Sequence, residues 1–172
     1  MSFERIRSEE VWSGRIATVR VDRVRFEDGE EADREVVEHP GAVGIVAHDG
    51  ERLYLVRQPR EAVNEQSLLE LPAGKLEGED PLETAKRELA EEIGKGAETW
   101  EHLTSFWTSP GFADEECHLF LATDLYDHSL EPDENERIEI VTVPLDRLRE
   151  TIEECRDSKT LVDLLWFERT RA

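Results

Sequence analysis

The sequence feature that most restricts the fold is a helix with clear start and stop signals within residues 71–94. Asp80 is a favourable N-cap, Pro81 suits the first helical position, and Gly94 is the expected stop. Four apolar residues between these ends recur every three or four positions and form one stripe: Leu82, Ala85, Leu89 and Ile93. A helix with a single apolar stripe can be buried against a sheet, so the sequence predicts a layered domain of helices and strands.

Three carboxylates lie beside this apolar stripe. Glu88 and Glu92 project side by side, and Glu91 is next to them. An isolated acidic helix face is most often solvated surface. The turn at residues 72–74 favours another interpretation, because it can present backbone carbonyls at the edge of the same acidic cluster. Oxygen ligands grouped in this way suit Mg²⁺ or Mn²⁺, which neutralise carboxylates and bind phosphate oxygens.

Strand-like segments surround the helix on both sides. Near-continuous apolar residues at 41–47 and 52–57 indicate central strands, joined at Asp49 and Gly50. Three more strands and two terminal helices follow: strands at 100–108, 117–125 and 137–143, a helix from Pro144 to about Cys155, and a helix from Ser158 that bears Leu161, Leu164, Leu165 and Trp166. The expected fold class is therefore an α+β sandwich with helices on both sides of a mixed sheet.

The amino-terminal segment forms a separate pattern. Residues 11–38 alternate imperfectly between apolar and polar side chains around a turn at Asp28 and Gly29. The polar content is high, so this sheet would be only marginally stable in isolation. Two interpretations stay open from the residues alone: a β-hairpin appended to the main domain, or a dimerisation arm that also covers part of a substrate.

The charge balance excludes some classes of partner. The chain has 172 residues, with 21 Lys and Arg against 42 Asp and Glu, and a formal net charge of −21. This length suits one catalytic domain with a small appended sheet. The charge repels nucleic acids and anionic membranes, so we expect neither as a partner. Only four lysines are present, and this acidic, lysine-poor balance is typical of a halophilic protein, because concentrated salt screens the self-repulsion.

Cysteine usage and the chain start indicate the compartment. Cys117 and Cys155 have neither the spacing of metal ligands nor that of a disulfide framework, so we expect reduced thiols. The first ten residues lack an apolar signal core, and no apolar run approaches the length of a membrane span. The sequence thus predicts a soluble, cytoplasmic protein.

Two loops and one strand end contain further candidate binding groups. Arg57 ends a predicted strand, and it could be a solvated cap or could clamp a phosphate. Phe112 and Glu115 follow a turn at 109–111 and are candidates for substrate contact, although Phe112 could instead plug the space under its loop. The acidic loop at 131–136 is, from its composition alone, solvated surface.

The stretch at 71–94 resembles the signature box of the Nudix hydrolases. In that box a glycine, five residues, a glutamate and seven residues precede the pattern Arg-Glu-apolar-any-Glu-Glu-any-Gly-apolar, and Glu79 with residues 87–94 fits it. Two positions depart from the pattern: only four residues separate Gly74 from Glu79, and Lys95 stands where an apolar residue is usual. The missing residue falls in a loop, so we expect altered loop geometry and an unchanged ligand set.

The resemblance extends from about residue 41 to 143. Five segments in this range are similar to the ADP-ribose pyrophosphatase branch of the family: GAVGIV, LYLVRQPR, LELPAGKLE, SPGFADEECHLFLA and DENERIEIV. It implies an α/β/α sandwich with a mixed central sheet and an antiparallel amino-terminal arm. It also implies Mg²⁺-dependent hydrolysis of ADP-ribose, or of a related nucleoside diphosphate derivative, to AMP and a sugar phosphate. The alternatives are another nucleotide sugar, NADH or a dinucleotide polyphosphate as substrate, or a non-catalytic nucleotide-sensing module.

The resemblance also implies roles for individual residues. The Ala73 carbonyl, Glu88 and Glu92 would hold the metal with help from Glu91, while Arg87 and Glu79 would brace the loop against the helix. Glu134 would be the general base and Glu136 a further metal ligand. Four residues are assigned to the substrate: Arg57, Gly74, Phe112 and Glu115. Residues 1–39 would form an arm exchanged across a homodimer, and residues 40–172 would form the catalytic domain.

Overall fold

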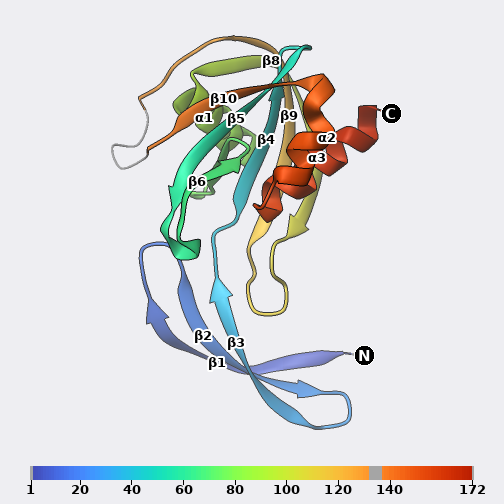
Figure 1. The fold of residues 1–172 in the computed structure, drawn as a ribbon. Coiled ribbons are helices and arrows are strands. Elements are labelled where there is room, and N and C mark those ends of the chain that lie inside the picture. The colour runs from blue at the N-terminus through green and yellow to red at the C-terminus, as the bar shows by residue number, and fades with distance from the viewer. Residues whose placement is uncertain (1, 132–136, 172) are drawn as a thin grey trace. The chain divides into compact units, whose positions relative to one another are not determined.

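The computed structural model describes residues 2–131 and 137–171, and these residues form two compact units (Figure 1). One unit contains the chain up to Gly41 together with Trp107–Glu116. The other contains Ala42–Phe106 and the chain from Cys117 onward. The units are called the arm unit and the main unit below.

The arm unit is built on three antiparallel strands: β1 (Phe3–Ser13), β2 (Thr18–Phe26) and β3 (Glu31–Glu38). The expectation that strand structure begins near Val11 is wrong, because β1 starts at Phe3 and pairs with β2 along its whole length. Its residues are almost all exposed, so its apolar pattern gives no signal. Backbone pairing with β2 is what orders this highly charged segment.

The main unit contains a mixed sheet with the strand order β10-β5-β4-β9-β8. Its central strands, β4 (Ala42–His48) and β5 (Arg52–Arg60), form the predicted hairpin. The remaining strands of this sheet are β6 (Glu65–Glu70) beside β5, β7 (Ala73–Lys75) beside β4, and β8 (Lys95–Trp107), β9 (Glu116–Asp127) and β10 (Glu139–Pro144). Because β4 is parallel to β9 and antiparallel to β5, the expected mixed sheet is confirmed.

Helices cover both faces of this sheet, as Figure 1 shows. On one face, α1 (Pro81–Ile93) buries its stripe of Ala85, Leu89 and Ile93 against residues of β4 and β9. On the other face, α2 (Leu148–Glu154) and α3 (Ser158–Arg171) bury Leu148, Leu164 and Phe167. The predicted α+β fold class, with helices on both sides of a mixed sheet, is therefore confirmed.

Several predicted boundaries differ from the structure. Strand β8 begins at Lys95 rather than Trp100, and β6 and β7 were not predicted, because their runs are short. The helix expected from Pro144 begins as a short 3-10 turn, Leu145–Arg147, before α2. The last helix begins at Ser158 as expected, and Asp157 before it caps its first turn by accepting the Thr160 N–H at 2.8 Å. Within the described residues, no helix is long and apolar enough to span a membrane.

Candidate active site

The ends of α1 fix which of its side chains are buried. Asp80 accepts the Leu82 N–H at 2.9 Å, Pro81 is the first helical residue, and Gly94 ends the helix with φ 66°. A left-handed φ of this kind favours glycine, so the predicted start and stop signals are confirmed. With the apolar stripe of α1 against the sheet, Glu88 and Glu92 are also drawn inward and are only 8% and 5% exposed.

A turn at Leu71–Gly74 faces these two carboxylates and is called the acidic turn below for that reason. Three hydrogen bonds fix its backbone. The Leu71 N–H donates to Thr160 Oγ1 at 2.9 Å, and the Pro72 carbonyl accepts from the Ile45 N–H at 2.9 Å. The Ala73 N–H donates to Glu92 Oε2 at 3.0 Å. The turn is thus held by α3, by the central strand β4 and by α1 at once.

Gly74 accounts for the close approach of the second carboxylate. Its missing side chain leaves room for the Glu88 carboxyl, because a Cβ at this position would collide with the Cδ and Oε1 atoms of Glu88. Since Glu92 bonds to Ala73 and Glu88 packs on Gly74, two buried carboxylates meet one backbone turn. Two buried carboxylates on one turn require compensation by hydrogen-bond donors, a cation or a proton.

Arg87 supplies part of that compensation. Its guanidinium pairs with Glu88 Oε1 at 2.8 Å and with Glu91 Oε2 at 2.6 Å, and its Nε lies 3.6 Å from Glu79 Oε2. Burial acts to lower the pKa of Arg87, but the charges of Glu88 and Glu91 outweigh it and the pKa is raised above its ordinary value. Arg87 is therefore a permanent cation that links the loop residue Glu79 to two of the helix carboxylates.

The donor set of the turn and helix fits a hard divalent ion in its chemistry. The carboxylates of Glu88 and Glu92 and the nearby backbone of Ala73 provide only oxygen donors, which Mg²⁺ and Mn²⁺ prefer. Among the described residues, however, no group of three or more His, Cys, Asp or Glu side chains is arranged to hold a metal. Glu134 and Glu136, assigned as base and ligand, lie outside the described residues.

Two arginines of β5 occupy different environments. Arg57 Nη1 donates to the Ser67 carbonyl at 3.1 Å. Arg60 forms a two-point pair with Glu70, with distances of 2.7 and 2.6 Å, and this hydrogen-bonded pairing together with the fields of Glu70 and Glu92 raises the pKa of Arg60. Arg60 is thus a cation within electrostatic reach of the acidic turn. The sequence reasoning missed it because the strand was expected to end at Arg57.

The remaining predicted substrate residues belong to the arm unit. Phe112 is 59% exposed, so the interpretation of its ring as a plug under the loop is wrong. Its backbone carbonyl accepts the Val37 N–H at 2.7 Å, which holds the loop to strand β3. Glu115 accepts the Thr108 hydroxyl at 2.6 Å and lies 3.6 Å from His39 Nδ1. Both residues lie in the loop that joins β8 to β9.

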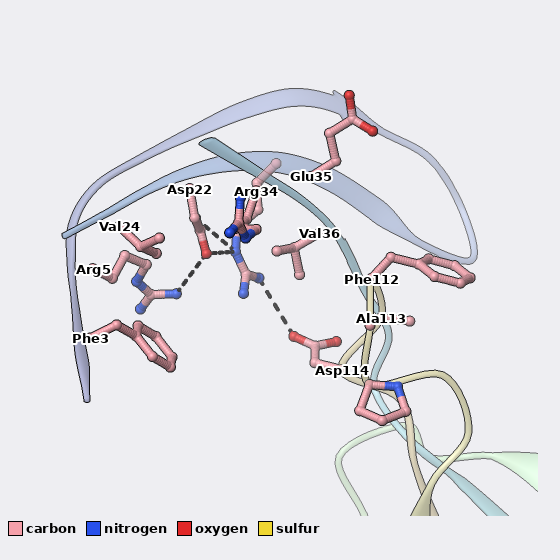
Figure 2. Close-up of a pocket in the computed structure, with 13 residues that line it drawn as sticks. Phe3, Arg5, Asp22, Val24, Arg34, Glu35, Val36, Phe112, Ala113 and Asp114 are labelled. Carbon is pink, nitrogen blue, oxygen red and sulfur yellow. Dashed lines mark hydrogen bonds and ion pairs between the residues drawn. The ribbon is translucent and has the colours of Figure 1, made fainter. Parts of the chain in front are cut away.

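A cavity of about 610 Å³ opens in the arm unit beside this loop (Figure 2). Phe3, Phe112 and three arginines, Arg5, Arg20 and Arg34, are among the residues that line it. Asp22 pairs with Arg5 at 3.4 Å, as Figure 2 shows, and with Arg20 at 3.1 Å. Arg20 also lies 3.5 Å from Asp114. Aromatic rings and cations in one cavity suit a ligand with a flat ring and negative charge.

Comparisons with known proteins agree with this architecture. Residues 38–165 match the model of the NUDIX domain, and residues 3–37 match that of the Nucleoside diphosphate sugar hydrolase N-terminal domain. The methanol dehydrogenase activator of Bacillus methanolicus is 43% identical over 169 residues, which cover 95% of this chain and 91% of the relative. The ADP-ribose pyrophosphatase of Bacillus subtilis (strain 168) is 40% identical over 169 residues, with the same coverage of 95% and 91%.

A solved structure gives the same result at the level of the fold. The crystal structure of an ADP compounds hydrolase aligns with a TM-score of 0.87 at 27% identity, covering 98% of this chain and 94% of that one. The domain match at residues 38–165 takes in more than half of the 172 residues, including α1 and the acidic turn. This protein therefore belongs to the Nudix hydrolase family, with a nucleoside diphosphate sugar hydrolase N-terminal domain ahead of its Nudix domain.

Proposed function

We propose that this protein is a Mg²⁺-dependent hydrolase that cleaves the diphosphate of ADP-ribose, or of a closely related nucleoside diphosphate derivative. The observation that carries the proposal is the pair of buried carboxylates, Glu88 and Glu92, held against the Ala73–Gly74 turn. Relatives named ADP-ribose pyrophosphatase, at 40% identity in Bacillus subtilis and 48% in Mycobacterium tuberculosis, support this choice of substrate. The products would be AMP and ribose 5-phosphate.

The metal would be held by oxygen ligands of the turn and the helix: the Ala73 carbonyl, Glu88, Glu91 and Glu92, together with Glu136. When bound, Mg²⁺ supplies positive charge against the diphosphate oxygens and makes water a stronger acid. Mn²⁺ has the same ligand preferences and is expected to substitute for it. Glu134 would accept the proton of the attacking water as general base.

Residues of the chain perform the positioning in this scheme. Gly74 lets the Glu88 carboxylate reach the turn, since any side chain there would displace it. Arg87 pairs with Glu88 and Glu91 and ties them to Glu79, which braces the loop before α1. Arg60 would draw the diphosphate toward Glu92, and Arg57 would contact it from the same strand.

The nucleoside end of the substrate would use the arm unit. The cavity lined by Phe3, Phe112 and Arg34 offers aromatic residues and cations, which suit an adenine ring and the phosphate carried by its ribose. Glu115 lies in the same loop and would bind ribose hydroxyl groups. Residues 1–39 would then act as a substrate-covering arm exchanged across a cytoplasmic homodimer, beside a catalytic domain of residues 40–172.

Product identification tests the proposal directly. The protein is incubated with ADP-ribose and Mg²⁺, and the products are separated by chromatography, beside parallel reactions with GDP-mannose, NADH and a diadenosine polyphosphate. We expect AMP and ribose 5-phosphate from ADP-ribose at the highest kcat/KM of the panel. Glu92→Gln should fold normally and lose turnover by about a hundredfold or more. Full activity in this variant would reject the assigned ligands, and a better substrate elsewhere in the panel would reject ADP-ribose.

A second candidate function is activation of a partner enzyme. The observation that favours it is the 43% identity to a protein named methanol dehydrogenase activator, over 91% of that relative. Methanol dehydrogenase assayed with and without this protein distinguishes the two candidates, especially when Glu92→Gln is included. Stimulation by the variant would indicate a non-catalytic nucleotide-sensing module, whereas stimulation lost together with hydrolysis would make activation a consequence of the hydrolase.

A further inference from the structure

Asp163 is a buried carboxyl group in α3 for which the proposed reaction has no use. Its side chain is 0% exposed, and among the described residues neither carboxyl oxygen has a hydrogen-bond partner. Burial raises the pKa of Asp163 to about 8, with the charge of Asp157 adding to the rise and Lys159 opposing it. A group in this state carries a proton at neutral pH and fits its site only in that form.

Asp163 packs on the residue of β4 that pairs with Ala73 of the acidic turn. A Cβ at Gly44 would collide with Asp163 Oδ2, so the carboxyl packs on the bare backbone of β4. Gly44 in turn pairs with Ala73 of β7. One helical turn before Asp163, Thr160 accepts the Leu71 N–H at 2.9 Å. The same helix therefore packs on the strand partner of Ala73 and anchors the start of the turn.

The groups around Asp163 offer an ionised carboxylate no partner without movement. Asp157 and Lys159 act electrostatically on Asp163, and Cys155 lies within the field of Asp163. Glu70 pairs with Arg60, and the His48 ring lies 5.2 Å from the ring of Phe167 in the same helix. At Gly44 the sheet presents bare backbone, with the apolar Leu119 side chain nearby. Lys159 lies in the first turn of α3, with its Nζ 3.8 Å from Asp157 Oδ1.

Ionisation would therefore act on the first turn of α3. Lys159 stands four residues before Asp163, a spacing at which opposite charges on a helix pair, but it is directed toward Asp157. Thr160 is next to Lys159 and is itself fixed by Asp157, which accepts from both its N–H and its hydroxyl at 2.8 Å. A shift of the first turn of α3 that brought Lys159 or water to Asp163 would also move Thr160, and Leu71 would then lose its anchor.

We propose that Asp163 is a proton-dependent positioning residue: with its proton it seats α3 on Gly44 and holds the Leu71–Gly74 turn in place, and without it the turn is released. This inference rests on the proposed function for its effect on turnover, because that turn bears the assigned metal ligand Ala73. Its structural part, the anchoring of Leu71, is independent of any activity. Alkaline pH is thus expected to loosen the active-site turn from behind the sheet.

Amide exchange at Leu71, followed by NMR in the metal-free protein, tests the structural part. In the wild type we expect the protection of this amide to fall about tenfold between about pH 7 and pH 9, after correction for the intrinsic exchange rate. In Asp163→Asn, which keeps the shape and cannot ionise, protection should change less than about twofold over the same range. Asp127→Asn removes the same charge from an exposed position and should behave as the wild type.

Turnover of ADP-ribose with Mg²⁺ provides the second measurement. The ratio of kcat for Asp163→Asn to kcat for the wild type should rise about tenfold from about pH 7 to pH 9, while KM changes little. Equal exchange profiles in the two proteins, or a wild type whose Leu71 protection has no step in this range, would overturn the proposal. Absence of hydrolysis at every pH with the exchange step intact would reject the proposed function and leave the positioning role of Asp163 standing.

Discussion

Each unit of this protein contains a buried aspartate, and the two aspartates are treated in opposite ways. In the arm unit, Asp22 is 5% exposed and accepts hydrogen bonds from Ser8 at 2.6 Å, Arg20 at 3.1 Å and Arg5 at 3.4 Å. Burial acts to raise the pKa of Asp22, but these partners outweigh it and the pKa lies below its ordinary value. In the main unit, neither carboxyl oxygen of Asp163 accepts a hydrogen bond from the described residues, and burial raises the pKa of Asp163 to about 8.

The difference reflects what holds each unit together. The arm unit has one thin sheet with little apolar burial, so its interior is an ion-pair network in which an ionised Asp22 is a structural component. The main unit has a sheet covered on both faces by the apolar faces of helices. In that interior a carboxyl group without hydrogen-bond donors is stable only with its proton. Burial alone therefore does not decide ionisation; the neighbouring donors do.

The largest effect is expected from Asp163→Asn. Its unfolded pKa of 3.8 is raised to about 8 on folding, so the folded state binds the proton more tightly and stability falls as pH rises between these values. Replacing the acid by a neutral amide should stabilise the fold by on the order of 4 kcal/mol near pH 8, and the gain should shrink as pH falls and vanish only below the unfolded pKa of 3.8. Urea unfolding across this pH range measures it. A gain independent of pH would show that Asp163 does not titrate as its surroundings predict.

Asp22→Asn should have a smaller effect of the opposite sign. The substitution removes the charge that faces Arg20 and Arg5, at a cost of on the order of 2 kcal/mol near pH 7. Because the folded pKa of Asp22 is depressed, its contribution is present above 3.8 and is lost as pH falls through the folded value. Amide exchange in β2 at neutral and acidic pH checks both parts. Unchanged protection in β2 would mean that Asp22 and its arginines do not stabilise the arm unit.

The helix α1 and its carboxylates could be predicted from the sequence. The caps at Asp80 and Gly94 and the apolar stripe between them were readable, since helix ends and helical periodicity depend on local residues. The position of Glu88 and Glu92 beside that stripe followed from the same periodicity. These local rules account for the helix and for its carboxylates at the turn.

The burial of Asp163 and the extent of strand β1 could not be predicted, because both depend on contacts between distant segments. Asp163 lies beside Leu164 in a helix whose stripe was taken from its leucines, yet Leu165 is exposed and Asp163 is buried, because Gly44 leaves a recess in β4. Strand β1 was missed for a related reason: its charged residues are ordered by pairing with β2. Neither the recess nor the pairing has a signal within the segment concerned.

Potassium chloride should give the smallest change and separate the two aspartates. The chain carries 42 acidic against 21 basic residues, so salt screens more repulsion than attraction. The Tm should therefore rise with KCl, and the free energy of unfolding should increase by on the order of 1 kcal/mol between about 0.1 and 1 M. Buried groups are screened far less, so the stability difference between Asp163→Asn and the wild type should stay constant within about 0.5 kcal/mol. The difference for Asp22→Asn should shrink, because the Arg5 side chain of its network is half exposed. Thermal unfolding of the three proteins at each salt concentration measures all of this. A Tm that fails to rise contradicts the halophilic interpretation, and a salt-dependent Asp163 difference would mean that water already reaches that carboxyl.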